Sequence, residues 1–444
     1  MDREFGARLM EAALSKGAAG AEVYIRRSRN LTVEVKDQDV DTLESSLSEG
    51  YCIRVIRDRR LGFSYSTDPA EWASVVEAAV EASRYTEPDE NLCLPGRAEV
   101  APVAIHDPLI AGITETKARE YALAMEKAAM DEDRRVTKIR KASGSFTASD
   151  TRIMNSEGVD SFYTSTGCSA QVMAIAEEGE EGQMGWDYEG SRFLAEVSFE
   201  RVGKTASRRA ADLLGARKIS PSKGFVLLDN SVVTEFLGIL SSALSSESVQ
   251  KKKSMLAGKT GELVMSPRIH ITDSGRLAGK LGSRPVDDEG VPTTEKRLVE
   301  AGLLKGFLYN SYTARKEGRL STGNAVRGGF TSLPSVGPSN LFIEPVSPEH
   351  GADRDKLLKT MGRGLLVTET MGMHTANPIT GEFSVGASGL WVEGGEIQHP
   401  VKEAVISGNI LDLFTHVALI GDDLRFYGGI GAPSLLIEGI DISG

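Results

Sequence analysis

The first half of the chain shows the same order of helix-like and strand-like hydrophobic patterns twice. In residues 2–16, apolar side chains recur at helical spacing, and residues 70–84 repeat this pattern. Between them lie strand-like runs: 23–25, then alternating apolar positions over 31–35, then Tyr51-Cys52-Ile53-Arg54-Val55-Ile56. The pattern therefore predicts a first unit made of a helix, several strands and a second helix.

A second unit follows a proline-containing linker at about 88–112. A helix is expected at about 115–131, strands near 135–147 and 151–155, and a closing helix at about 195–215. The run Met184-Gly185-Trp186-Asp187-Tyr188 parallels the earlier Leu61-Gly62-Phe63-Ser64-Tyr65. We interpret the two units as a duplication, although any chain that mixes helices and strands can show some alternation of this kind.

The pattern changes after a Ser- and Pro-containing break at 219–224. Residues 225–229 are apolar without alternation, which is typical of a buried strand, and a helix with a broad apolar face follows. From Glu262 onward glycines and period-two patches predict mostly strands, with one short helix near 353–363. We therefore predict an α+β fold: a duplicated helix–antiparallel sheet–helix N-terminal half and a mainly β C-terminal domain. The predicted domains are 1–218, with subunits of about 1–87 and 113–218, and 222–444.

Composition narrows the functional classes. The chain has 444 residues, 40% hydrophobic and 26% charged, which is ordinary for a globular protein. Its three cysteines are dispersed, which argues against a disulfide framework or a Cys-rich zinc module and favours a cytoplasmic setting. No apolar run approaches the length of a membrane span. The net charge of −12 opposes non-specific binding to nucleic acid, so neither nucleic acid nor a membrane is expected as a partner.

One segment, residues 281–324, is the most distinctive. It reads LGSRPVDDEGVPTTEKRLVEAGLLKGFLYNSYTARKEGRLSTGN and combines a three-carboxylate turn, a Gly-Val-Pro exit and a Ser-Tyr-Thr-Ala-Arg run. Together with the runs at 338–341 and 421–444, it resembles the TldD/PmbA family, once called modulators of DNA gyrase. The resemblance extends over nearly the whole chain. It implies a relation to a heteromeric zinc metalloprotease with a metal-bearing TldD subunit and a PmbA or TldE subunit.

The metal ligands of that family are missing from this sequence. The catalytic branch is marked by a His-Glu-x-x-x-His helix and a cysteine far along the C-terminal half, and catalytic zinc takes three such protein ligands plus a water. Alignment on the basic run 251–253 places Gly238, Ile239 and Ala243 at the motif positions, where small residues would suit close packing of the helix. No histidine lies between 107 and 269, and no cysteine follows Cys168. The resemblance therefore points to the PmbA/TldE branch, with no cofactor in this chain and zinc in its partner.

Several polar residues remain as candidates for a substrate groove or an interface. The acidic turn suits a hard cation such as Mg²⁺, but the nearby arginine can neutralise it, and we favour a structural turn. The tyrosine and arginine of the 311–315 run suit contacts with a peptide backbone or carboxylate, and equally an interface or core role. A histidine in a Gly-rich loop is more often a hydrogen-bonding group than a ligand. The candidates are Arg284, Asp287, Asp288, Glu289, Tyr312, Arg315, Asn324 and His374.

The sequence thus predicts a non-catalytic, PmbA/TldE-like subunit of a cytoplasmic TldD/TldE-type zinc metalloprotease. The resemblance implies a TldD-like partner and extended or unfolded peptides as substrates, in peptide degradation or leader-peptide maturation. A homodimer of the isolated chain is also compatible with it. Two alternatives stay open: an autonomous hydrolase with a new site at the acidic turn, and a binding module that modulates a partner such as DNA gyrase.

Overall fold

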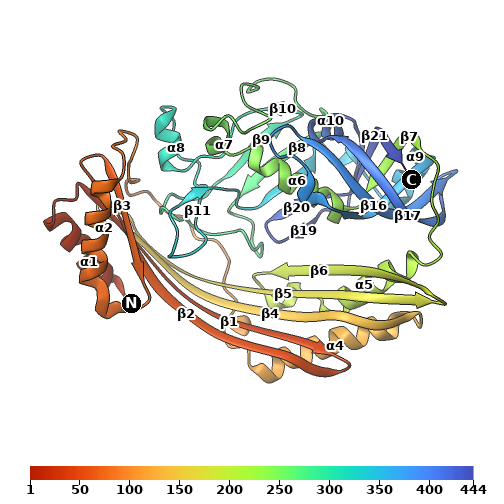
Figure 1. The fold of residues 1–444 in the computed structure, drawn as a ribbon, viewed down its shortest axis with the longest axis horizontal. Coiled ribbons are helices and arrows are strands. Elements are labelled where there is room, and N and C mark those ends of the chain that lie inside the picture. Colours follow the sequence, from red (N-terminus) through yellow and green to blue (C-terminus); the bar gives the residue numbers. More distant parts are fainter. Residues whose placement is uncertain (444) are drawn as a thin grey trace.

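Two layers of structure face each other across the molecule. The computed structural model describes residues 1–443. A long, curved sheet built from the first half of the chain forms one layer, and the C-terminal domain lies over one of its faces (Figure 1). The N-terminus lies at the lower left end in this view and the C-terminus at the opposite end of the upper layer.

The curved sheet unites the two predicted repeats. Each repeat contributes three antiparallel strands, and the first strands of the two repeats pair with each other, so that the order is β3-β2-β1-β4-β5-β6. Because the sheet is continuous, the duplication is one of sequence units and not of separate sheets. The strands are β1 (Gly20–Lys36), β2 (Asp39–Arg57), β3 (Arg60–Ser66), β4 (Val136–Asn155), β5 (Asp160–Glu178) and β6 (Glu181–Ser191).

Helices flank each group of three strands, as the hydrophobic pattern predicts. The first pair packs on β1–β3 around Leu9, Val55 and Val76, and the second pair packs on β4–β6 around Met125, Val172 and Val202. This burial stabilises both repeats, since apolar area removed from water contributes about 25 cal/mol per Å². The helices are α1 (Arg3–Ser15), α2 (Trp72–Ala82), α4 (Glu115–Glu132) and α5 (Phe199–Asp212), with a short α3 (Pro108–Ala111) in the linker.

The C-terminal domain is mainly β. One sheet has the order β14-β18-β21-β17-β16-β15-β7, and an added β21–β7 pairing closes five of its strands into a ring. Its strands are β7 (Ser222–Leu228), β14 (Gly351–Ala352), β15 (Arg363–Met371), β16 (Glu382–Glu393), β17 (Glu396–Asn409), β18 (Val417–Gly421) and β21 (Leu435–Ser443).

A second sheet of this domain, with the order β10-β9-β8-β13-β20-β19, carries the segment singled out by the sequence. Its strands are β8 (Ile269–Ser274), β9 (Glu295–Glu300), β10 (Leu303–Leu304), β13 (Leu341–Pro345), β19 (Arg425–Tyr427) and β20 (Ile430–Ala432). A small ribbon pairs β11 (Ala325–Val326) with β12 (Ser335–Val336). The helices are α6 (Asn230–Ala243), α7 (Ser246–Gln250), α8 (Ser311–Lys316), α9 (Arg354–Met361) and α10 (Ile410–Thr415).

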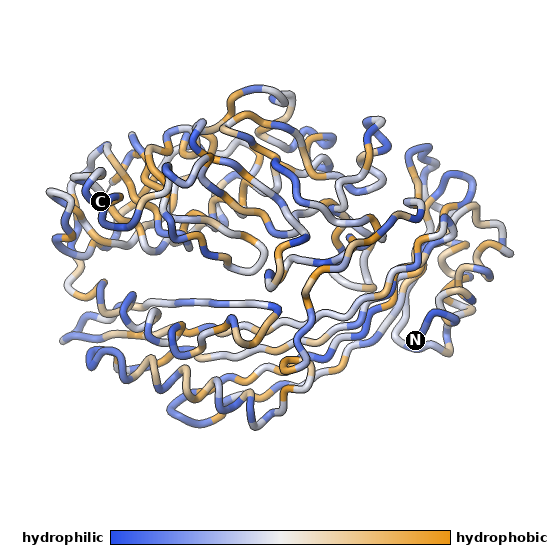
Figure 2. The backbone as a smooth tube through the Cα atoms, turned by 180° about the vertical axis from the view of Figure 1, so that it is seen from behind, coloured by the Kyte–Doolittle hydropathy of each residue, from blue (hydrophilic) through white to orange (hydrophobic). Residues whose placement is uncertain are grey.

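The predicted fold class is confirmed, while the lengths of the N-terminal strands differ from the prediction. The separate runs 23–25 and 31–35 form one strand, β1, and 135–147 and 151–155 form one strand, β4. The polar residues between those runs do not end the strands, because the backbone ladder continues through them. Figure 2 shows this mixture of polar and apolar residues along the long strands.

None of the helices within residues 1–443 combines the length and the apolar character that crossing a membrane requires.

Candidate functional site

The acidic turn lies inside the molecule, where the C-terminal domain meets the curved sheet. It belongs to the loop between β8 and β9, and a bridge between Val286 and Pro292 closes it. The Asp287 amide donates to the Val291 carbonyl at 2.8 Å, and Gly290 adopts a φ of +86° that favours glycine. All three carboxylates are buried: Asp287 0%, Asp288 5% and Glu289 0% exposed.

Asp287 holds the turn together from within. Its carboxylate accepts hydrogen bonds from the backbone amides of Glu289 (2.9 Å), Val291 (3.0 Å) and Ala325 (2.9 Å). Burial and then the nearby charge of Glu289 raise the pKa of Asp287, and the amide donors oppose this rise. This side chain is saturated with backbone donors, so its role is to shape the turn.

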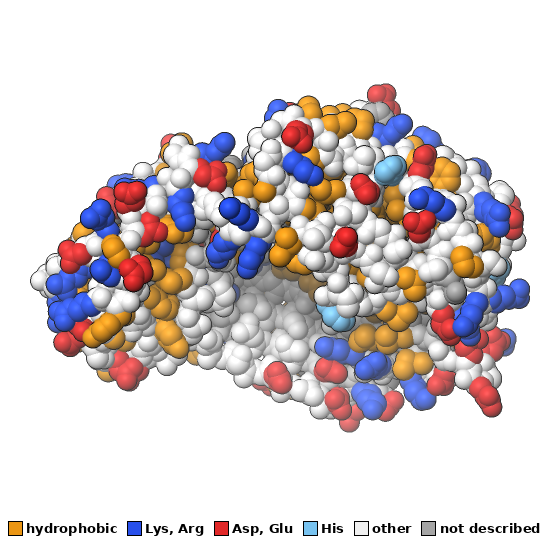
Figure 3. Space-filling view, turned by 45° about the horizontal axis from the view of Figure 1, so that its top comes forward, with side chains coloured by type: hydrophobic (Ala, Val, Ile, Leu, Met, Phe, Trp, Pro, Cys, Tyr) orange, Lys and Arg blue, Asp and Glu red, His pale blue; other side chains and the backbone are white. Residues whose placement is uncertain are grey.

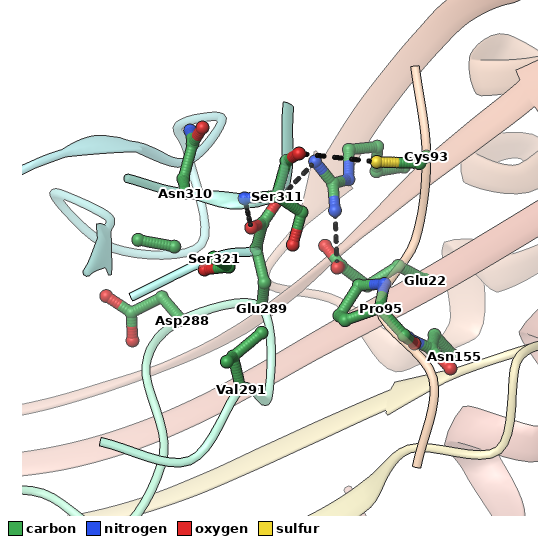
Figure 4. Close-up of polar contacts among 12 residues, drawn as sticks. Glu22, Cys93, Pro95, Asn155, Asp288, Glu289, Val291, Asn310, Ser311 and Ser321 are labelled. Carbon is green, nitrogen blue, oxygen red and sulfur yellow. Dashed lines mark hydrogen bonds and ion pairs between the residues drawn. The ribbon is translucent and has the colours of Figure 1, made fainter. Parts of the chain in front are cut away.

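The other two carboxylates of the turn face arginines. Arg284 Nη1 donates to Asp288 Oδ2 at 2.8 Å, and Arg54 Nη1 on β2 donates to Glu289 Oε1 at 3.0 Å. The second Glu289 oxygen accepts from the Ser311 amide at 2.8 Å, at the start of α8. Figure 4 shows Glu289 beside Ser311, with Glu22 nearby.

Glu22, on β1, completes the contact between the domains. Arg54 Nη2 donates to Glu22 Oε2 at 2.6 Å, and Arg327, just after β11, forms an ion pair with the other Glu22 oxygen. Glu22 is 1% exposed and Arg54 is 7% exposed. Three arginines and three carboxylates thus form a buried group in which Arg54 contacts two carboxylates and Glu22 contacts two arginines. We call it the interdomain ion cluster: Glu22, Arg54, Arg284, Asp288, Glu289 and Arg327.

Donors from the protein already bind most of the carboxylate oxygens of the turn. Guanidinium or amide donors bind Asp288 Oδ2 and both oxygens of Glu289. Breaking such a group leaves an uncompensated buried charge, which costs several kcal/mol, so its evident consequence is to fix how the two domains meet. The hypothesis of a structural turn agrees with these contacts better than the hypothesis of a metal site.

The remaining sequence candidates do not join one site. Asn324 is buried and bonded to Asp273 and to the Gly337 carbonyl, so it braces the loop that leads into β11. The Tyr312 hydroxyl donates to Asp89 Oδ2 at 2.7 Å, a contact between α8 and the linker of the first domain. Arg315 is exposed at the end of the same helix.

His374 belongs to another part of the surface. It lies in a short turn between β15 and β16 and is exposed. The structure therefore separates His374 from the acidic turn in the fold, since the two belong to different sheets of the C-terminal domain.

The sequence alignment places the family's metal motif on α6, and the structure shows how exposed the predicted positions are. Ala243 is 0% exposed and packs in the core, where no ligand could reach an open site. Gly238 has no neighbouring element within 4 Å of the position of a Cβ, so close packing does not explain this glycine. The predicted positions therefore do not share one open face of the helix.

The open face of α6 is instead formed by residues at helical spacing. These residues are partly or fully accessible to solvent, and Gly238, which has no side chain, leaves open space between the others. We define the open face of α6 as Glu235, Gly238, Ile239 and Ser242.

Carboxylates on this face lack the arginine partners of the turn. Thr370 Oγ1 donates to Glu235 Oε2 at 2.6 Å, and Glu369 stands next to Thr370 on β15. Burial raises the pKa of Glu235; burial and then the charge of Glu235 raise the pKa of Glu369, which Arg209 partly offsets.

Zinc does not fit the donors found here. The open face offers one carboxylate, a hydroxyl, a glycine and an isoleucine, whereas a catalytic zinc site uses three His, Cys or carboxylate ligands. Across residues 1–443, no three His, Cys, Asp or Glu side chains are grouped so that they could hold a metal ion.

Sequence reasoning missed the N-terminal half of the interdomain ion cluster. Arg54 is the one charged residue in the apolar run 51–56, and Glu22 directly precedes another apolar run. A charged residue within a strand of this kind is a usable signal, because burial of an unpaired charge is costly and predicts a partner. Which partner it meets depends on a loop more than 200 residues away.

Known proteins of one family are similar to this chain over almost its whole length. Family models described as PmbA/TldA metallopeptidase domain 1, central domain and C-terminal domain match residues 21–83, 108–214 and 221–444. A protein named metalloprotease PmbA from Escherichia coli O157:H7 is 33% identical over 433 residues, covering 96% of this chain and 92% of the relative. A metalloprotease TldD homolog from Haemophilus influenzae is 24% identical and covers 96% of this chain and 92% of that protein.

Solved structures are similar to the same extent. A putative modulator of a DNA gyrase from Thermotoga maritima superposes with a TM-score of 0.91 at 32% identity, covering 99% of both chains. TldE from Thermococcus kodakarensis has a TM-score of 0.90 at 22% identity, covering 99% of this chain and 100% of that one, which shows a shared fold. With its three domains matched and its relatives covered almost end to end, this chain belongs to the PmbA/TldD metallopeptidase family.

Proposed function

We propose that this chain is the non-catalytic, TldE-like subunit of a TldD/TldE-type metalloprotease, which acts with a zinc-bearing, TldD-like partner. The observation that carries the proposal is the helix α6. It stands where the family's metal motif is expected, yet its open face carries neither histidine nor cysteine. Since zinc chemistry requires such donors, the peptide-cleaving chemistry is assigned to the partner.

The substrates under this proposal are extended or unfolded peptides, in degradation or leader-peptide maturation, in the cytoplasm. The wide surface between the curved sheet and the C-terminal domain supports this. Figure 3 shows the molecule hollowed between its two lobes, with Lys and Arg side chains at the margin of the hollow. An extended peptide can bind such a surface through its backbone and through its charged groups.

The test is reconstitution. The purified chain, a TldD-like protein with the His-Glu-x-x-x-His motif, and their mixture are compared for complex formation by size-exclusion chromatography, for zinc content and for cleavage of an unfolded peptide. We expect a complex with zinc in the partner and activity only in the mixture. A partner that is fully active alone and never associates with this chain would exclude the proposal.

A matched pair of variants locates the chemistry. Replacing the motif glutamate of the partner by glutamine is expected to abolish cleavage, because that glutamate can act as general base. Glu235→Gln in this chain is expected to leave cleavage in place. Loss of cleavage in the second complex, with assembly intact, would instead assign a catalytic role to this chain.

A further inference from the structure

A small polar pocket lies beside the interdomain ion cluster, between the curved sheet and the C-terminal domain. Its volume is about 290 Å³. The sheet contributes residues of β1, β4 and β5, including Tyr24, Arg26 and Tyr163, and the loops of the C-terminal domain contribute Arg284 and Arg327. Arg192, immediately after β6, also lines it.

The charges around this pocket do not balance. Arg284 and Arg327 have their carboxylates within the interdomain ion cluster. Arg192 is paired only with neutral acceptors: the backbone carbonyls of Thr166 (2.9 Å), Ser283 (3.2 Å) and Leu281. Arg26 makes no side-chain hydrogen bond or ion pair with any other residue in 1–443. Asp288 also lines the pocket, where it is paired with Arg284, so the guanidinium groups of Arg26 and Arg192 face the pocket without an acidic partner of their own.

The Arg192 guanidinium group is destabilised by its burial without an acidic partner. Burial, and the charges of Arg26 and Arg284 beyond it, lower the pKa of Arg192 to about 10, with only Tyr163 acting in the opposite direction. The Nε atoms of Arg192 and Arg284 are both buried and have no hydrogen-bond partner. An unpaired buried charge is costly, and an anion bound in the pocket would offset the charge of Arg192.

We propose that this pocket binds a carboxylate group of a peptide, with Arg26 and Arg192 as its principal contacts. A guanidinium group presents paired donors that match the two oxygens of a carboxylate. Further hydroxyl groups line the wall of the pocket, those of Tyr24, Thr151, Tyr163 and Ser165.

A carboxylate fits better than the phosphate of a nucleic acid. The pocket accommodates a small group, and the chain as a whole carries a net charge of −12, which repels a polyanion. The choice of a peptide as the bearer of the carboxylate rests on the proposed function. The carboxylate can be the C-terminus of the peptide or an acidic side chain, and the experiment distinguishes them.

The test uses the full chain without any partner protein, so that its failure is distinct from a failure of the metalloprotease complex to assemble. Isothermal titration calorimetry at low salt compares four probes. They are N-acetyl-Ala-Ala-Ala, its C-terminal amide, N-acetyl-Ala-Glu-Ala-amide and inorganic phosphate.

We expect the peptide with a free C-terminus to bind at least about tenfold more tightly than its amide, because a hydrogen bond to a charged group is lost. Equal binding of the glutamate peptide would support the pocket and identify acidic side chains as a source. Binding of both amides as tightly as the free acid, or of phosphate alone, would overturn the proposal.

Variants place the binding in this pocket. Arg26→Gln and Arg192→Gln are each expected to weaken binding of N-acetyl-Ala-Ala-Ala at least about tenfold. Arg27→Gln is the matched control, since Arg27 is the next residue on β1 and its side chain points to the opposite face of the sheet. Because Arg26 has no partner to lose, Arg26→Gln should fold normally. Undiminished binding by Arg26→Gln and Arg192→Gln would overturn the assignment.

Discussion

The acidic turn and the open face of α6 both carry carboxylates on the C-terminal domain, and the fold treats them in opposite ways. At the turn, Asp288 and Glu289 are buried and each faces an arginine. On and beside α6, Glu235 and Glu369 lie close to each other. The charges of the turn hold the two domains together through ion pairs. The carboxylates on and beside α6 lie at an open surface and have no arginine partner among residues 1–443.

The comparison teaches that a conspicuous cluster of carboxylates in a sequence need not be the reactive one. The three consecutive acids at 287–289 attract attention, yet backbone amides or guanidinium groups bind each of these carboxylates. Glu235 is inconspicuous in the sequence because its companion comes from β15, more than 130 residues later. What distinguishes a structural cluster of carboxylates from one that can bind a ligand is whether arginine or amide donors already bind them, and not how many carboxylates it has.

The largest effect is expected from breaking the interdomain ion cluster. Arg54→Met leaves Glu22 and Glu289 buried without their shared guanidinium, which costs about 3–5 kcal/mol of unfolding free energy. Urea unfolding measures this loss. Arg3→Met, which removes an exposed ion pair with Asp160, is the control and should change stability little. Equal effects of the two variants would contradict a fastening role for the cluster.

A second substitution tests the shape of the turn. Gly290→Ala places a Cβ against Val159 at a φ of +86°, so we expect a loss of about 2 kcal/mol in the same urea experiment. Gly179→Ala, at a φ of +64° but with nothing within 4 Å, carries the conformational cost without the clash. If both alanine variants lose the same amount, the packing of the turn on the first domain contributes nothing.

The stability of the protein should depend on pH through Glu369, which has no arginine partner in the described part of the chain. The folded state raises the pKa of Glu369, so the folded protein binds more protons than the unfolded chain and stability falls as the pH rises above the ordinary value of this group. Glu369→Gln removes that loss, and we expect a gain of about 1 kcal/mol at pH 8 that shrinks at pH 5. Urea unfolding at the two pH values measures it, and a gain independent of pH would contradict this account.

The smallest effect concerns the hollow of α6. Gly238→Ala fills open space in a helix interior, so it should raise the unfolding free energy by about 0.5 kcal/mol. Thermal unfolding monitored by circular dichroism detects the change, with Gly203→Ala, whose Cβ would meet the backbone of α4, as a destabilising counterpart. A destabilised Gly238→Ala protein would show that this face is covered in solution.

Much of the fold was predictable from periodicity. The apolar faces of residues 2–16, 70–84 and 115–131 predicted α1, α2 and α4, since helices bury one face at helical spacing. Strand lengths were less accessible, because β1 continues through polar residues such as Ser28 and Asn30 that pack against neighbours across the sheet. The site was predictable only in part: the arginine next to Asp288 was foreseen, and Arg54 and Arg327 were not.

The sequence by itself determined the repeat of helix and strand units, the family and the lack of histidine and cysteine ligands on α6, because these depend on local pattern and residue identity. Only the tertiary structure decided which charges are paired. Glu22 and Arg327 are 305 residues apart, and Arg26 and Arg192 meet across strands and loops that no local pattern relates. The energy of a buried charge depends on what surrounds it in space, so its role becomes visible only after the chain has folded.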